Sequence, residues 1–176
     1  MSKDELRVTL AQYQSGIPAD ISNVRRRATD WLVDQLDKPC LWGKKGPEVF
    51  DCSGLVTCCI LAMGGPDLRV TYNAQRLYDE SEPSDTTEHL SLAFYGAHNM
   101  RVEHVAIWCA SGQVVSASGA TSRIKTFEAA RAAGARVRVH KTPRYRPDFL
   151  RFHRNIWLEN LEFKEKFRGT SSNELG

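Results

Sequence analysis

The sequence contains no long apolar run and no common pattern of metal ligands. No stretch approaches the roughly eighteen apolar residues of a transmembrane helix, so we expect no membrane span. Neither a Cys-x-x-Cys nor a His-x-x-x-His pair occurs. We therefore predict no metal site and no other cofactor.

Charge of one sign and paired cysteines are also scarce. The formal net charge is only +3, and the basic residues between 131 and 146 lack the interleaved aromatic platform of single-strand binders, so we predict no nucleic-acid partner. The five cysteines are an odd number, and the adjacent Cys58 and Cys59 would form a strained disulfide with each other. We expect reduced thiols in a protein that is synthesised in the cytosol.

The most informative segment is 50–56, which reads Phe-Asp-Cys-Ser-Gly-Leu-Val. An apolar run continues to Met63 and ends at a Gly-Gly-Pro stop signal, which predicts a buried helix that begins at Cys52. The first turn of a helix carries unpaired N–H groups and the positive end of the helix dipole. We therefore expect the pKa of the Cys52 thiol to lie below its ordinary value of about 8.5.

His104 is the predicted partner of this cysteine. It begins an apolar, β-branched run to Cys109, and a turn around Gly112 leads into a returning strand over 114–119. A cysteine at a helix N-terminus that faces a histidine on a sheet is the arrangement of cysteine nucleophile catalysis. In such a site the imidazole takes the thiol proton, and a thiolate–imidazolium pair forms.

The remaining periodicity predicts an α+β fold, in which N-terminal helices pack on a small antiparallel β-sheet. A cleft is expected at the junction of helices and sheet, with the polar segment 66–87 as a surface loop beside it. The predicted elements besides those above are a helix capped within 21–23 that runs to 37, a strand over 90–95, a helix over 126–133 and a strand over 136–141.

These motifs, in this order, resemble the NlpC/P60 cysteine peptidases, a bacterial and phage cell-wall family with a papain-like fold. The resemblance covers about residues 24–139. It rests on the segments 38–43 (KPCLWG), 50–56 (FDCSGLV), 71–75 (TYNAQ), 92–96 (LAFYG), 104–108 (HVAIW) and 112–118 (GQVVSAS).

The resemblance implies a function and a set of site residues. The substrate it implies is a stem peptide of peptidoglycan, which Cys52 would attack with His104 as base. The third catalytic position falls on Ser116. The backbone N–H of Cys52 would meet the oxyanion. The implied substrate-binding residues are Asp51, Ser53, Trp42 and Cys40, although Asp51 is equally suited to cap the helix.

Two positions differ from the family's pattern. Ser116 stands where the family usually has His, and otherwise Asn or Gln, and Cys40 stands where it usually has a tyrosine that helps to shape the oxyanion region. A serine hydroxyl can accept a hydrogen bond from an imidazole N–H, but it carries no charge. His140 is a second candidate for the third position. Because strand alternation separates it from the apolar Val137 and Val139, we interpret it as a solvent-side histidine.

We divide the chain into three parts. Residues 1–147 form the predicted catalytic domain, 148–168 a C-terminal extension, and 169–176 a disordered tail. The apolar side chains of the extension could wrap the core or bind a partner, and we favour wrapping. The charged residues 1–7 contain no hydrophobic signal region. We therefore expect a phage particle, a holin or a secretion system to deliver the protein from the cytoplasm to the cell wall.

Three functions fit these observations. We favour an active peptidoglycan endopeptidase of phage or delivered-effector type. The first alternative is another Cys/His amidase or an acyltransferase on the same scaffold. The second is a non-catalytic wall-binding or structural module, which the substitutions at Cys40 and Ser116 leave open.

Overall fold

The computed structural model describes residue 17 and residues 19–97, 101–109 and 111–171. They form an α+β fold around one five-stranded sheet, in which every neighbouring pair of strands is antiparallel. The strand order is β4-β3-β2-β1-β5. The elements in chain order are α2 (Asn23–Asp34), α3 (Cys52–Ala62), α4 (Ala74–Glu80), β1 (Leu92–Ala97), β2 (Arg101–Trp108), β3 (Val114–Ser118), α5 (Phe127–Ala132), β4 (Arg136–His140), the 3-10 turn η1 (Pro143–Tyr145), β5 (Phe149–His153) and α6 (Ile156–Ser171).

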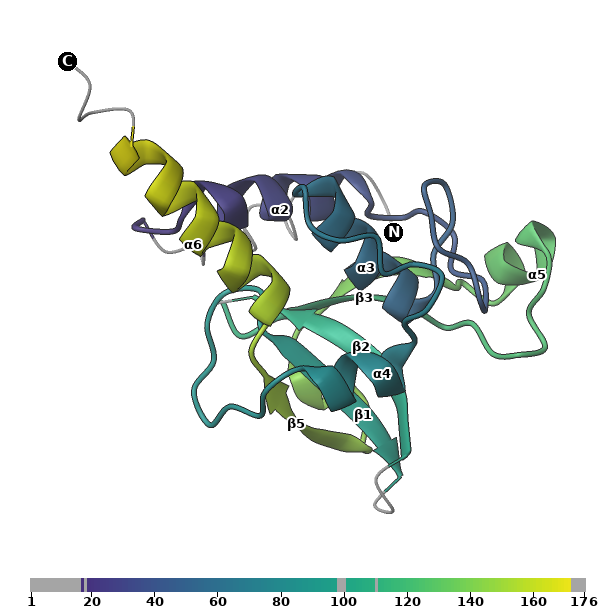
Figure 1. Cartoon of the computed structure of the whole chain (residues 1–176). Helices are drawn as coiled ribbons and strands as arrows, with labels where there is room; N and C mark the ends of the chain where they lie inside the picture. The colour runs from purple at the N-terminus through teal and green to yellow at the C-terminus, as the bar shows by residue number, and fades with distance from the viewer. Residues whose placement is uncertain (1–16, 18, 98–100, 110, 172–176) are drawn as a thin grey trace.

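The helices α2, α3 and α6 lie on the same side of the sheet (Figure 1). α3 is apolar on nearly every face and sits in the main core, where Leu55 and Ile60 are fully buried with Phe94, Val105 and Ile107 of the sheet. Burial of this apolar area is the main stabilising contribution to the arrangement. The predicted fold class, with N-terminal helices on an antiparallel sheet, is confirmed.

Two helical predictions need correction. α2 begins after Ser22, whose hydroxyl accepts a hydrogen bond from the Arg25 backbone as predicted, but it ends at Asp34 rather than 37. Asp37 has a φ of 66°, which an α-helix cannot contain. The predicted loop over 66–87 also contains the helix α4, capped by Asn73. The sequence signal was weak because this seven-residue helix buries only Ala74 and Leu77.

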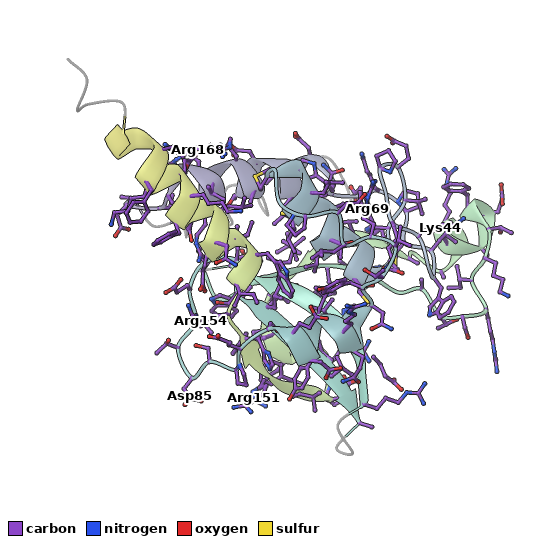
Figure 2. The ribbon with its side chains drawn as sticks, viewed as in Figure 1. Lys44, Arg69, Asp85, Arg151, Arg154 and Arg168 are labelled. Atoms are coloured by element: carbon purple, nitrogen blue, oxygen red, sulfur yellow. The ribbon has the colours of Figure 1, made fainter. Side chains whose placement is uncertain are left out.

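The C-terminal segment supplies an edge strand and a helix of the fold. β5 pairs with β1, and α6 packs against α2, where Arg25 Nε lies 2.8 Å from Glu162 Oε1. Arg154, labelled in Figure 2, joins Glu159 of α6 to Glu82 in the loop between α4 and β1 through two ion pairs. Leu158 of α6 is buried in the core. The predicted tail over 169–176 begins inside α6, and its residues 172–176 lie outside the described residues.

The sheet has a second, smaller apolar cluster on the face opposite α3. Ala93, Tyr95, Ala106 and Val114 form it, and Tyr145 packs against it. No helix in the described part of the chain is long and apolar enough to cross a bilayer.

The central strands β2 and β3 are joined over a short length. Only Ile107–Val115 and Trp108–Val114 pair between them, whereas β3 pairs with β4 along its whole length. α3 contacts both strands. Before Ile107, β2 pairs with β1 only. Its edge on the β3 side is therefore open to groups from the start of α3.

Candidate active site

Cys52 is the first residue of α3, and Asp51 caps the helix. Asp51 Oδ1 accepts hydrogen bonds from the backbone N–H of Gly54 at 2.5 Å and from the Ser53 hydroxyl at 3.0 Å. Lys45 Nζ lies 3.2 Å from the same oxygen and 2.5 Å from Ser53 Oγ. These contacts fix the first turn of α3 and leave Cys52 partly exposed beside the buried Ser53.

The Cys52 sulfur lies beside the part of β2 that has no partner strand on its β3 side. Hydrogen bonds from the backbone of Val105 and of Ser53 act to lower the pKa of its thiol. Since such bonds must be donated to sulfur, the Val105 N–H points toward Cys52. Val105 directly follows His104 on β2, so the backbone that contacts the thiol belongs to the residue next to the histidine.

The predicted low pKa of Cys52 is wrong. Burial, followed by the nearby Asp51 carboxylate, raises the pKa of the thiol to about 11. The N–H groups at the helix start act in the expected direction, but removing a thiolate from water outweighs them. At neutral pH Cys52 therefore rests as a neutral thiol.

His104 is a buried, neutral imidazole. Its side chain projects from β2 next to Tyr95 and is 6% exposed. Burial, followed by the positive charge of Arg146, lowers its pKa to about 3. The predicted thiolate–imidazolium pair is therefore not the resting state, because neither group is charged near pH 7.

A tyrosine hydroxyl lies between His104 and Ser116. Tyr145 Oη is 2.7 Å from His104 Nε2 and 3.2 Å from Ser116 Oγ. The structure thus connects Ser116 to His104 through Tyr145, whereas the sequence predicted a direct contact. Tyr145 comes from η1 and was missed, because its only signal was a tyrosine within a Thr-Pro-Arg-Tyr-Arg-Pro segment that reads as a strand break.

His140 also belongs to this group, and its interpretation as a solvent-side histidine is wrong. Its Nε2 lies 3.2 Å from Ser116 Oγ and 3.1 Å from Ser118 Oγ. The imidazole stacks on the Tyr145 ring, with the two centroids 3.6 Å apart. Alternation on β4 was read correctly, but the segment after β4 covers this face of the sheet, so burial lowers the pKa of His140 to about 4.

The predicted substrate-binding residues lie in different environments. Trp42 is 67% exposed, whereas Cys40 is buried and burial raises the pKa of its thiol to about 12. Asp51 and Ser53 bind each other and Lys45, as described above. The backbone N–H of Ser53 points to the Cys52 sulfur. The backbone N–H of Cys52 has no backbone acceptor among the described residues, which leaves it as the donor available to an oxyanion.

The arrangement can carry out acyl transfer through a thiol nucleophile. A thiol and an N–H donor at a helix start lie beside Val105 of β2, and the neutral imidazole of His104 belongs to the neighbouring residue of that strand. No group of three or more His, Cys, Asp or Glu side chains among the described residues could hold a metal ion.

Comparison with known proteins identifies one family and a curated relative with a matching name. The model of the NlpC/P60 family matches residues 37–154. A curated relative, the probable endopeptidase p60 of Listeria grayi, is 29% identical over 87 residues, which are 47% of this chain and 16% of that protein. The chain thus spans about a sixth of that relative's length.

Solved structures show the same fold at low sequence identity. The P60 domain of an antigen from M. avium subspecies paratuberculosis is 22% identical with a TM-score of 0.54, covering 76% of this chain and 94% of that one. The peptidoglycan hydrolase RipB from Mycobacterium tuberculosis is 21% identical with a TM-score of 0.51, covering 87% of this chain and 83% of that one.

Proposed function

Because the chain belongs to the NlpC/P60 family of peptidoglycan hydrolases, we propose that it is a cysteine endopeptidase that cleaves a stem peptide of peptidoglycan. The observation that carries this proposal is the position of Cys52. Its sulfur lies at the start of α3 against the backbone of Val105, the residue that follows His104 on β2. The substrate class comes from the family and from the relatives, since a fold alone hosts several chemistries.

The proposed reaction begins from neutral partners. The Cys52 sulfur attacks the carbonyl carbon of the peptide bond while His104 takes the thiol proton, so that charge separation occurs only as the bond forms. The free N–H group of Cys52 donates to the oxyanion. Collapse breaks the C–N bond, and the imidazolium returns its proton to the leaving amine.

The second half of the reaction releases the enzyme. Water attacks the thioester carbon, and His104 takes a proton from that water. The carboxylic acid leaves, and the proton returns to the Cys52 sulfur. Overall, one water and one peptide bond are converted into one carboxyl and one amino group.

The direct test is digestion of purified peptidoglycan, with the released fragments identified by mass spectrometry. The wild-type protein should release fragments cut within the stem peptide, and Cys52→Ala should release none. Cys59→Ala, on the same helix but buried away from the reacting group, is the matched control and should keep the activity. Release of whole stem peptides from the sugar would instead identify an amidase. Transfer to an added amine would identify an acyltransferase, and intact sacculi with retained binding a non-catalytic module.

Delivery to the wall is a separate part of the proposal. We propose a phage particle, a holin or a secretion system as the route. Cells that express the protein in the cytoplasm should then lyse only when such a route, for example a holin, is expressed with it. Lysis by the protein alone would contradict this part without affecting the enzymatic proposal.

A further inference from the structure

We propose that Tyr145 is the residue that positions the imidazole of His104, and that Ser116 in turn holds the tyrosine hydroxyl while His140 holds the tyrosine ring. This inference rests on the proposed roles of Cys52 and His104. It assigns the orienting function to a side chain from η1, outside the strand that carries the expected third position.

The distances favour Tyr145 over Ser116 as the direct partner. The contact between Tyr145 Oη and His104 Nε2 is 2.7 Å, a short hydrogen bond for an oxygen and a nitrogen. Ser116 Oγ instead lies 3.2 Å from both Tyr145 Oη and His140 Nε2. A longer side chain at position 116 would enter the space of the tyrosine hydroxyl. The small serine therefore makes room for Tyr145 as well as binding it.

The Tyr145 ring is held on both sides. His140 stacks on one face at an interplanar angle of 11°, and Tyr95 contacts the ring edge-on with centroids 5.3 Å apart. A ring clamped in this way loses little further freedom when its hydroxyl binds His104. The hydroxyl is thus preorganised for the imidazole.

The proposed role requires one tautomer of His104 and one order of donors along this chain of contacts. Because Nε2 is occupied by Tyr145, Nδ1 is the nitrogen that must be free to take the Cys52 proton. Nε2 then carries the hydrogen and donates it to Tyr145 Oη. Tyr145 donates to Ser116 Oγ, and Ser116 donates to His140 Nε2. Every hydrogen in this order has an acceptor.

The ionisation states agree with this order. Burial raises the pKa of Tyr145 to about 12, so its hydroxyl keeps the proton that it donates to Ser116. His140, with its pKa lowered by burial to about 4, is neutral near pH 7 and can accept at Nε2. The partner of His104 is thus a neutral dipole, which orients the ring without adding a negative charge beside it.

The test compares single-hydroxyl deletions. Tyr145→Phe keeps the stacked ring and removes only the oxygen, and we expect kcat for peptidoglycan cleavage to fall about 10- to 100-fold with KM nearly unchanged. Ser116→Ala should cost less, about two- to fivefold, because it acts through Tyr145. The double variant should be no slower than Tyr145→Phe alone, since both changes interrupt one chain of contacts.

Tyr95→Phe is the matched control. The Tyr95 ring lies 5.4 Å from the His104 ring, but its buried hydroxyl has no hydrogen-bond partner among the described residues. Its removal should leave kcat within about twofold of wild type, as expected of a hydroxyl that makes no bond. Tyr145→Phe at wild-type kcat, or Ser116→Ala slower than Tyr145→Phe, would overturn the proposal.

A measurement without substrate separates this inference from the proposed function. Nitrogen-15 NMR of the histidine rings should show His104 with its hydrogen on Nε2 in the wild type, and a mixture of tautomers in Tyr145→Phe. A wild-type His104 with its hydrogen on Nδ1 would refute the positioning role. If the wild type fails to cleave peptidoglycan but shows the expected tautomer, the proposed function fails while the positioning by Tyr145 stands.

Discussion

The proposed site has a Cys52 side and a Tyr145 side, which are built in different ways. On the side of Cys52, one short segment at the start of α3 supplies the nucleophile, the Asp51 cap and the free N–H donor. On the side of Tyr145, single residues from β3, β4 and η1 converge from distant parts of the chain. The first region needs only a correct helix start, whereas the second requires the whole sheet and its C-terminal cover.

The difference shows how a substituted site can keep its geometry. Contacts within a helix turn constrain one another through the backbone, so the nucleophile segment matches the family's pattern closely. Across the sheet, any side chain that brings an acceptor to the same point can serve. A tyrosine from η1 occupies the place next to Nε2 that the sequence predicted for Ser116.

The largest expected effect tests the side of Cys52. We predict that His104→Gln lowers kcat/KM for peptidoglycan cleavage by about 1,000-fold or more, because a carboxamide cannot take the thiol proton. His89→Gln is a control, since His89 is a buried histidine that contacts Thr29 of α2. Substantial activity in His104→Gln would show that the imidazole does not act as the base.

The second prediction concerns acid stability and bears on the side of Tyr145. Burial lowers the pKa of His104 to about 3 and those of His89, His140 and His153 to about 4, from an ordinary 6.5. Below pH 6.5 the unfolded chain binds protons that the folded protein does not. The free energy of unfolding should therefore be highest above pH 6.5 and fall as the pH drops toward 4, by up to about 1.4 kcal/mol per pH unit for each histidine.

Urea unfolding between pH 4.5 and 7.5 measures this slope. The variant His140→Gln removes one of the four histidines. It should reduce the slope by nearly the contribution of one proton, about 1.4 kcal/mol per pH unit. An unchanged slope would mean that the His140 side of the site is open to water. Burial from water would then not be a property of the Tyr145 region.

The third prediction sharpens the role of Asp51. Asp51→Ala should lower the free energy of unfolding by about 1–2 kcal/mol, because α3 loses its cap. Asp51→Asn keeps a capping oxygen and should cost less. Since the Asp51 carboxylate raises the pKa of Cys52, both variants should lower that pKa. Alkylation of Cys52 by iodoacetamide near pH 8, followed by mass spectrometry, should then be faster than in the wild type.

The smallest expected effect is at the edge of the Tyr145 region. Ser118 Oγ lies 3.1 Å from the His140 nitrogen that already accepts from Ser116 in our assignment. A single lone pair cannot accept from both hydroxyls. Ser118→Ala should therefore change the free energy of unfolding by less than about 0.5 kcal/mol and leave kcat within twofold. A larger loss would show that Ser118, and not Ser116, is the donor to His140.

Much of the fold could be read from local patterns. The helix that begins at Cys52, the hairpin around Gly112 and the strand at Arg136 all carry strong local signals, and each forms as predicted. The missed elements lack such signals. α4 buries too few residues to show a period, and β5 follows two prolines that appeared to end the sheet. Pairing of β5 with β1 outweighs its weak local preference.

The sequence by itself determined the helix start at Cys52 and the strand that carries His104, because both depend on residues close together in the chain. The tertiary structure decided the ionisation of the pair and the partner of the imidazole. The pKa of Cys52 depends on burial from all directions, which outweighs the local helix start. Tyr145 reaches His104 only after forty-one residues of chain have returned across the sheet, and no local pattern carries that contact.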